Sequence, residues 1–144
     1  MGSPPDGTVT VDGRAEVAAR LCLSATRLAR RLRQESGAGL TPSQLSALAV
    51  IADRGPLTLG TLAELESVAP PSITKLVAKL VADGLVVRSV DARDRRIVHI
   101  SVTARGAALM SESRRRKTAW LAKRIGRLDP EQQGRLSAVL DVLD

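Results

Sequence analysis

Apolar residues near the start of the chain follow a helical spacing. They are separated alternately by four and three residues, which places them in one stripe along a helix. The pattern predicts a first helix over residues 14–36, and the glycines that follow are expected to end it. The members of the stripe are Leu21, Ala25, Leu28 and Leu32.

A second helix is predicted from its start signal. Thr41 suits the N-cap, Pro42 the first turn, and Gln44 the closing position of a capping box. The sequence Arg54-Gly55-Pro56 is expected to break this helix. The positions predicted to form its buried face are Leu45, Leu48, Ala49 and Ala52.

Residues 57–102 predict a helix, a short turn, a second helix and a two-stranded hairpin. Thr58 is expected to cap the first of these helices, residues 59–66, with its apolar side facing the core. The paired prolines after Ala69 open the second, which runs to Asp83 and stops at Gly84. The inward positions of the first of these two helices are Leu59, Leu62, Ala63 and Leu65.

The helix after the paired prolines has two different faces. Its core stripe is predicted to contain Ile73, Leu76, Val77 and Leu80. The opposite face carries small or polar residues and two lysines, and short side chains let a helix backbone approach a DNA groove while long cations reach phosphates and base edges. The candidate DNA-contacting residues on this helix are Pro71, Ser72, Thr74, Lys75 and Lys79.

A basic loop, residues 91–96, joins the two predicted strands, residues 85–90 and 97–102. Arg93, Arg95 and Arg96 provide more positive charge than solubility requires, so they are candidate DNA contacts. Asp91 and Asp94 are expected to hold these arginines by pairing with them. A helix-turn-helix followed by a cationic hairpin is typical of a winged helix that binds duplex DNA.

Two more helices are predicted after the hairpin. Thr103 is expected to cap a long helix that reaches about Arg127, and Asp129 to cap a final helix. The fold class is therefore mainly α with a small β-wing, a winged helix-turn-helix lobe joined to helical arms. The apolar stripe of the last helix consists of Leu136, Val139, Leu140 and Leu143.

The charge distribution supports a polyanionic partner. The 144-residue chain has a net charge of +7, and residues 103–128 alone carry eight basic residues against one acidic residue. One Trp and no Tyr or Phe leave little surface for stacking unpaired bases, which favours duplex DNA over single strands or RNA.

The segments Ala69–Val86, Asp91–Arg96 and Val102–Gly106 together resemble the MarR family of bacterial transcriptional regulators, and the resemblance extends over residues 14–143. It implies a homodimer that binds a pseudo-palindromic operator in double-stranded DNA. It also implies that an aspartate equivalent to Asp94 orients the wing and that Arg96 can enter the minor groove. Relatives bind small effectors, so a repressor released by a small effector is expected, with activation as the alternative.

The resemblance implies a division of the chain at residues 13, 40 and 102. Residues 1–13 would be a disordered N-terminal lead, 14–40 a dimerisation helix, 41–102 the DNA-binding lobe and 103–144 the C-terminal dimerisation helices. Apolar stripes at both ends exceed what one lobe needs for its core, which independently favours a dimer. The candidate interface residues are Leu21, Leu28, Leu136, Leu140 and Leu143.

Other functions are weaker alternatives. A sequence-neutral architectural nucleic-acid-binding protein would use the same positive charge. No phosphate-binding loop, nucleophile–histidine pair or metal-ligand spacing is visible, so neither an enzyme nor a cofactor or metal is expected. No apolar run is long enough to cross a membrane, and one cysteine forms no internal disulfide, which fits the cytoplasm.

Four further features keep open interpretations. Cys22 is expected to be a small buried thiol on the first helix, and His99 to lie on the outer face of its strand. Trp120 is expected to pack in the core or at a dimer interface. The basic run from Arg114 to Lys117 is predicted to be a solvated helix surface, with a second phosphate-contacting patch or a site for an anionic effector as the alternatives.

Overall fold

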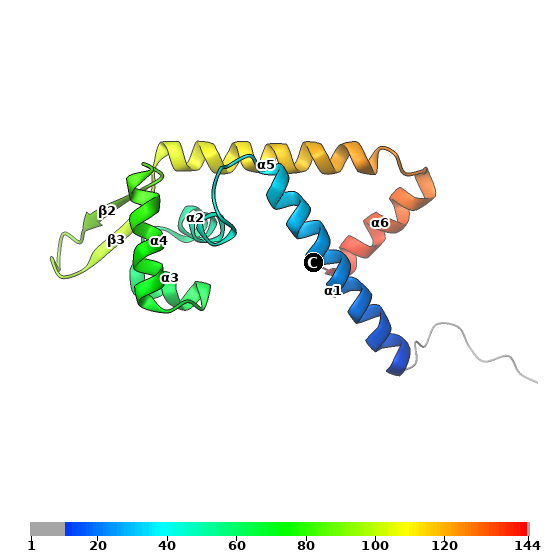
Figure 1. The fold of residues 1–144 in the computed structure, drawn as a ribbon, viewed down its shortest axis with the longest axis horizontal. Helices are drawn as coiled ribbons and strands as arrows, with labels where there is room; N and C mark the ends of the chain where they lie inside the picture. Colours follow the sequence, from blue (N-terminus) through cyan, green and yellow to red (C-terminus); the bar gives the residue numbers. More distant parts are fainter. Residues whose placement is uncertain (1–10, 144) are drawn as a thin grey trace, which may run out of the picture. The chain divides into compact units, whose positions relative to one another are not determined.

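The computed structural model describes residues 11–143 of the chain, and residues 1–10 of the predicted disordered lead lie outside the described residues. The described part of the chain divides into two compact units, residues 11–34 and residues 35–143. Mainly α-helical structure with one small sheet agrees with the predicted fold class (Figure 1).

The described part of the first unit lies in helix α1 (Val11–Glu35), whose last residue already belongs to the second unit. The helix begins at Val11 rather than at residue 14, so residues 11–13 are helical and do not belong to a disordered lead. Asp12 lies in its first turn, where a negative charge interacts favourably with the helix dipole. The apolar stripe is present and exposed, with Leu21 and Leu28 at 45% and 42% relative exposure.

The second unit begins with three helices, α2 (Pro42–Arg54), α3 (Leu59–Glu66) and α4 (Pro70–Ala82). Thr41 caps α2 with the predicted capping box, since its hydroxyl accepts from the Gln44 backbone amide and the Gln44 side-chain oxygen accepts from the Thr41 backbone amide. The hydroxyl of Thr58 accepts from the Thr61 amide and caps α3 as predicted.

The two strands of the predicted hairpin are β2 (Val86–Val90) and β3 (Val98–Val102). They pair antiparallel, with Val86 opposite Val102 and Val90 opposite Val98. A short strand that the sequence did not predict, β1 (Leu57–Thr58), pairs with the other edge of β3. The order β1-β3-β2 makes β3 the central strand.

Two helices complete the chain, α5 (Ala104–Ile125) and α6 (Pro130–Leu143). Figure 1 shows α5 as a long helix that begins beside the hairpin, with α6 turning back after it. Thr103 caps α5 through the Gly106 amide, and its hydroxyl donates to the Gly84 carbonyl at 2.7 Å. Every described residue of α6 is exposed.

The hydrophobic core lies where α2, α3 and α4 meet the sheet. Leu48, Leu62, Val77, Leu80 and Ile100 are fully buried there. Aliphatic side chains make up the whole cluster, as expected for a chain without Phe or Tyr.

Two predictions about buried positions were wrong. Ala52 is exposed, whereas Ala47 and Ile51 are buried, because α2 contacts α3, α4 and β3 and its buried face extends around the helix toward those two residues. Leu65 is 41% exposed because it lies at the edge of a short helix whose core contacts come from Leu62 and Ala63.

Gly106 allows α5 to approach the turn between α4 and β2. A Cβ atom at this position would lie 2.2 Å from the backbone carbonyl oxygen of Leu85. We expect Gly106→Ala to lower the free energy of unfolding by about 1–3 kcal/mol, because backbone must move to make room. Chemical denaturation monitored by circular dichroism measures the change.

Gly60→Ala is the matched control for this prediction. Gly60 is an exposed helical glycine whose added Cβ would meet only the Thr58 hydroxyl, at 3.8 Å. The variant should be neutral or stabilised by up to about 1 kcal/mol, since Ala favours helix more than Gly does. Equal stability of the two variants would contradict the close approach at Gly106.

Candidate nucleic-acid interface

Helix α4 is positioned by a tight turn and a one-sided core contact. Ser67 ends α3 in a left-handed conformation with φ of 52°, and the chain re-enters helix at Pro70. The Ala69 cap has no side-chain hydrogen bond, but prolines at the first positions of α4 need no amide partner. Ile73, Val77 and Leu80 are then buried, which fixes the rotation of the helix.

The opposite face of α4 is exposed. Small or polar residues occupy its first two turns, and the Thr74 hydroxyl donates to the Pro70 carbonyl at 2.9 Å. The candidate DNA contacts on this helix are all exposed and lie off the core stripe, namely Pro71, Ser72, Thr74, Lys75 and Lys79.

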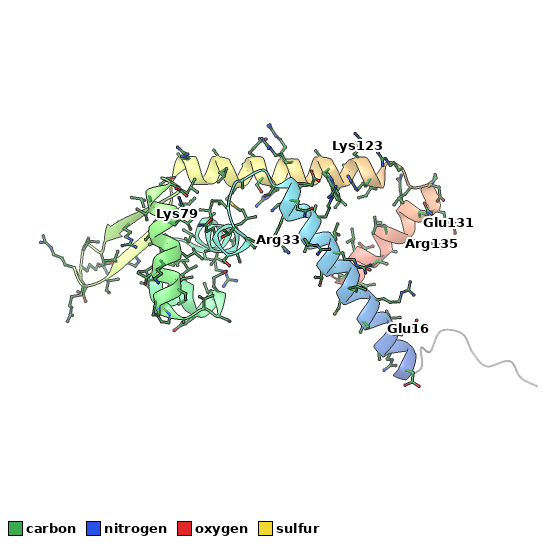
Figure 2. The ribbon with its side chains drawn as sticks, viewed as in Figure 1. Glu16, Arg33, Lys79, Lys123, Glu131 and Arg135 are labelled. Carbon is green, nitrogen blue, oxygen red and sulfur yellow. The ribbon has the colours of Figure 1, made fainter. Side chains whose placement is uncertain are left out.

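The two lysines of α4 differ in their surroundings. Lys79, labelled on α4 in Figure 2, donates to the Asp83 carboxylate at 2.8 Å, one turn further along the chain. Lys75 has no ion-pair partner within residues 11–143. A phosphate that binds Lys79 must therefore compete with Asp83, whereas Lys75 is available without such competition.

The wing loop is organised by two aspartates. Asp91 Oδ1 accepts from the backbone amides of Arg93 and Asp94, at 2.8 and 2.9 Å. Asp94 accepts from the Arg96 amide at 3.0 Å and from the Arg96 guanidinium Nε and Nη2 at 3.1 and 3.2 Å. This bidentate pair orients a guanidinium whose side chain is 91% exposed.

The aspartates thus do different things. Asp94 pairs with an arginine, as the sequence led us to expect. Asp91 instead holds backbone amides and accepts from His99, whose Nε2 lies 3.1 Å from Asp91 Oδ2. Arg93 and Arg95 extend from the loop without an ion-pair partner in the described part of the chain.

His99 was missed as a member of this site. It is half-buried on the strand face opposite the buried Ile100, and no role beyond that outer face was predicted for it. Its position near the loop end of the hairpin, across from the strand that leads into Asp91, was the signal available in the sequence.

The wing carboxylates have lowered pKa values. Hydrogen bonds from the Asp94 and Arg93 amides, and then from His99, hold the pKa of Asp91 below its ordinary value of 3.8. The Arg96 guanidinium, followed by its amide, lowers the pKa of Asp94 in the same way. Each shift arises because hydrogen bonds to the ionised form favour it.

The predicted dimer residues are exposed in the single chain. On α6, Leu136, Leu140 and Leu143 are 36%, 52% and 57% exposed, and Leu21 and Leu28 are exposed on α1.

Cys22 is also exposed, so the prediction of a buried thiol was wrong. Helix α1 taken by itself has no core that could cover this side chain.

The basic run on α5 is partly neutralised. Arg115 and Arg116 both pair with Glu112, at 2.6 and 2.9 Å, while Arg114 is exposed. Pairing to Arg116 and Arg115 lowers the pKa of Glu112.

Further along α5, Trp120 is half-buried and the Arg124 guanidinium lies 3.4 Å from the centre of its ring.

The exposed α4 face and the cationic hairpin define a winged helix-turn-helix DNA-binding protein. The sequence profile of the MarR family matches residues 40–98. An uncharacterized HTH-type transcriptional regulator of Mycobacterium bovis is 37% identical over 134 residues, which cover 92% of this chain and 94% of the relative. The chain belongs to the MarR family of transcriptional regulators, and it is not an enzyme.

Solved structures share the fold. A MarR family protein from Bacillus stearothermophilus matches with a TM-score of 0.77 and 26% identity, covering 94% of this chain and 96% of that one. A point mutant of Staphylococcus aureus MepR, bound to an oligodeoxyribonucleotide, matches with a TM-score of 0.72 and 19% identity. The match covers 88% of this chain and 94% of that one.

None of the helices within residues 11–143 has the length and apolar character of a membrane span.

The lowered pKa values predict how the wing responds to acid. A depressed folded-state pKa contributes stability that is complete above the ordinary value of 3.8 and is lost as pH falls through the lower, folded value. We expect the amide NMR signals of Arg93, Asp94 and Arg96 to shift with midpoints below 3.8 as these carboxylates are protonated.

The control for this titration is Asp94→Asn, which removes the ionisable group beside Arg96. The Arg96 transition should disappear in this variant, whereas the Arg93 transition, which follows Asp91, should remain. Midpoints above 3.8 would contradict the hydrogen-bonded carboxylates described above.

Proposed function

We propose that this regulator acts as a homodimer that binds a pseudo-palindromic operator in double-stranded DNA and represses transcription. A dimer bound over a promoter blocks polymerase sterically, and an effector that changes the separation of the two α4 helices weakens binding, because both half-sites must be met together. A bacterial chromosome lies in the cytoplasm, so a cytoplasmic location is part of the proposal.

The oriented Arg96 side chain is the observation that carries the proposal. Its guanidinium is exposed at the end of a two-stranded hairpin and is fixed by Asp94 on one edge. An arginine held in this way enters a narrow minor groove with less loss of side-chain freedom than a mobile one. Arg93 and Arg95 beside it supply phosphate contacts.

Helix α4 is proposed to lie in the adjacent major groove. Ser72 and Thr74 are short exposed residues near its N-terminus, where backbone amides and the helix dipole favour a phosphate. Lys75 and Lys79 reach phosphates or base edges from the same face. The oligodeoxyribonucleotide-bound MepR structure, which shares this fold, is consistent with this use of the lobe.

The dimer is supported by the leucines left exposed. Leu136, Leu140 and Leu143 lie on one side of α6, and Leu21 and Leu28 lie on one side of α1. Soluble monomers rarely expose apolar residues in such continuous stripes, so a second copy of the chain is the proposed cover.

A sequence-neutral architectural role is the alternative. It would draw on the same positive charge without using the α4 face for base contacts. Equal affinity for all duplexes of one length would favour this alternative, whereas preference for one palindromic site favours the regulator.

Arg96→Ala should weaken operator binding by about 1–3 kcal/mol, the range for a groove contact. Fluorescence anisotropy with a duplex selected from genome-wide bound sites measures the change. Arg115→Ala is the charge-matched control, since Arg115 pairs with Glu112 on α5 and not with the wing. Equal losses in both variants would mean that net charge, rather than the wing, determines affinity.

Sedimentation at micromolar concentration should show a dimer. Leu140→Glu should raise the dimer dissociation constant at least about tenfold, because an unpaired carboxylate would be buried. Val142→Glu is the control, because Val142 lies about 160° around the same helix from Leu140 and is 83% exposed. A monomeric wild-type protein would refute the paired-arm proposal.

A further inference from the structure

His99 lies on β3, the central strand of the sheet, which pairs with a strand on each side. It pairs with Thr58 of β1 on one side and with Ser89 of β2 on the other. The next residue, Ile100, is completely buried in the core. The backbone of His99 is therefore fixed by two neighbouring strands and by an adjacent core side chain.

The imidazole of His99 reaches from this strand to the wing loop. Its Nε2 atom lies 3.1 Å from Asp91 Oδ2, and both side chains are about 30% exposed. An ionised carboxylate only accepts, so Nε2 is the donor. The other nitrogen, Nδ1, is buried without a hydrogen-bond partner in the described part of the chain.

This orphan atom fixes which neutral tautomer is compatible with the site. A tautomer with its proton on Nδ1 would bury an unpaired donor and turn the Nε2 lone pair toward the carboxylate. Of the two neutral tautomers, only the one with its proton on Nε2 therefore donates a hydrogen bond to Asp91.

A continuous series of hydrogen bonds then connects His99 to Arg96. Asp91 accepts from His99 through Oδ2 and from the Arg93 and Asp94 amides through Oδ1. Asp94 in turn accepts from the Arg96 amide and guanidinium. The carboxylate of Asp91 is the only member of this series that joins the loop to a strand side chain.

We propose that His99 is a positioning residue for DNA binding, which holds the arginine-bearing wing loop in its binding conformation through Asp91. This inference rests on the proposed function, in which Arg96 contacts DNA. Residues 91–97 also have backbone hydrogen bonds, from the Asp91 amide to the Ile97 carbonyl and from the Ile97 amide to the Asp94 carbonyl. Those bonds close the hairpin but do not involve the Asp91 carboxylate.

Without the His99 donor, Asp91 Oδ2 turns to water and its hold on the Arg93 and Asp94 amides weakens. The loop then samples more conformations in the free protein. DNA binding must restore the single conformation that orients Arg96, and the lost conformational freedom reduces affinity.

Two substitutions at position 99 separate the hydrogen bond from packing. His99→Leu introduces an apolar side chain of similar size that has no hydrogen-bond donor. His99→Gln places an amide NH₂ near the position of Nε2 and retains the donor. Thermal unfolding of both variants checks that the fold is preserved.

The first measurement uses the free protein. Amide hydrogen exchange at Arg93 and Asp94 should accelerate in His99→Leu and remain near the wild-type rate in His99→Gln. Exchange in α4, which does not depend on this bond, should be unchanged in both. Equal exchange in the wild type and His99→Leu would overturn the proposal.

The second measurement is operator affinity. His99→Leu should bind about five- to tenfold more weakly, the equivalent of one net hydrogen bond, and His99→Gln should bind within about twofold of the wild type. In an Arg96→Ala background, His99→Leu should cost less affinity than in the wild type, because only the contacts of Arg93 and Arg95 then remain to depend on the loop. A full additional loss in that background, or equal losses for Leu and Gln, would overturn the proposal.

The failure of the proposed function has a different signature. If Arg96→Ala leaves operator affinity unchanged, the wing does not contact DNA, and both proposals fall. If Arg96→Ala weakens binding but His99→Leu does not, only the role of His99 is refuted.

Discussion

The burial of one side of α4 is the constraint on which the DNA-binding surface depends. Ile73, Val77 and Leu80 lose nearly all their exposed area to the core, which sets the rotation of the helix about its own axis. Once that side is inside, Lys75 and Lys79 must face outward. The recognition surface is therefore a consequence of the core, and aliphatic packing, not charge, determines where the charges point.

The wing loop, residues 91–96, is different, because it has no core to orient its side chains. Asp91 and Asp94 take that role by accepting hydrogen bonds from the loop backbone and from Arg96. The two carboxylates lower the net positive charge of the loop, but they hold the loop backbone and the Arg96 guanidinium in one conformation. Order in an exposed arginine matters for binding because a disordered side chain must be restrained when it meets its ligand.

Much of the fold could be predicted from the sequence because its signals are local. The caps at Thr41, Thr58 and Thr103 lie where the sequence placed them, since each depends on neighbours within three residues. Predictions that depended on tertiary contacts were less accurate. The exposed Ala52 and the unpredicted strand β1 depend on which elements lie beside them. The Asp91–His99 bond joins residues eight positions apart, and only the hairpin register brings them together.

The joint at Gly106 has a consequence for how motion spreads through the second unit. The Thr103 amide donates to the Leu85 carbonyl, the Thr103 hydroxyl donates to the Gly84 carbonyl, and no side chain separates Gly106 from the same turn. Backbone therefore meets backbone where α5 starts and α4 ends. Because no side chain lies between these two stretches of backbone, the turn after α4 must adjust whenever the first turn of α5 is displaced.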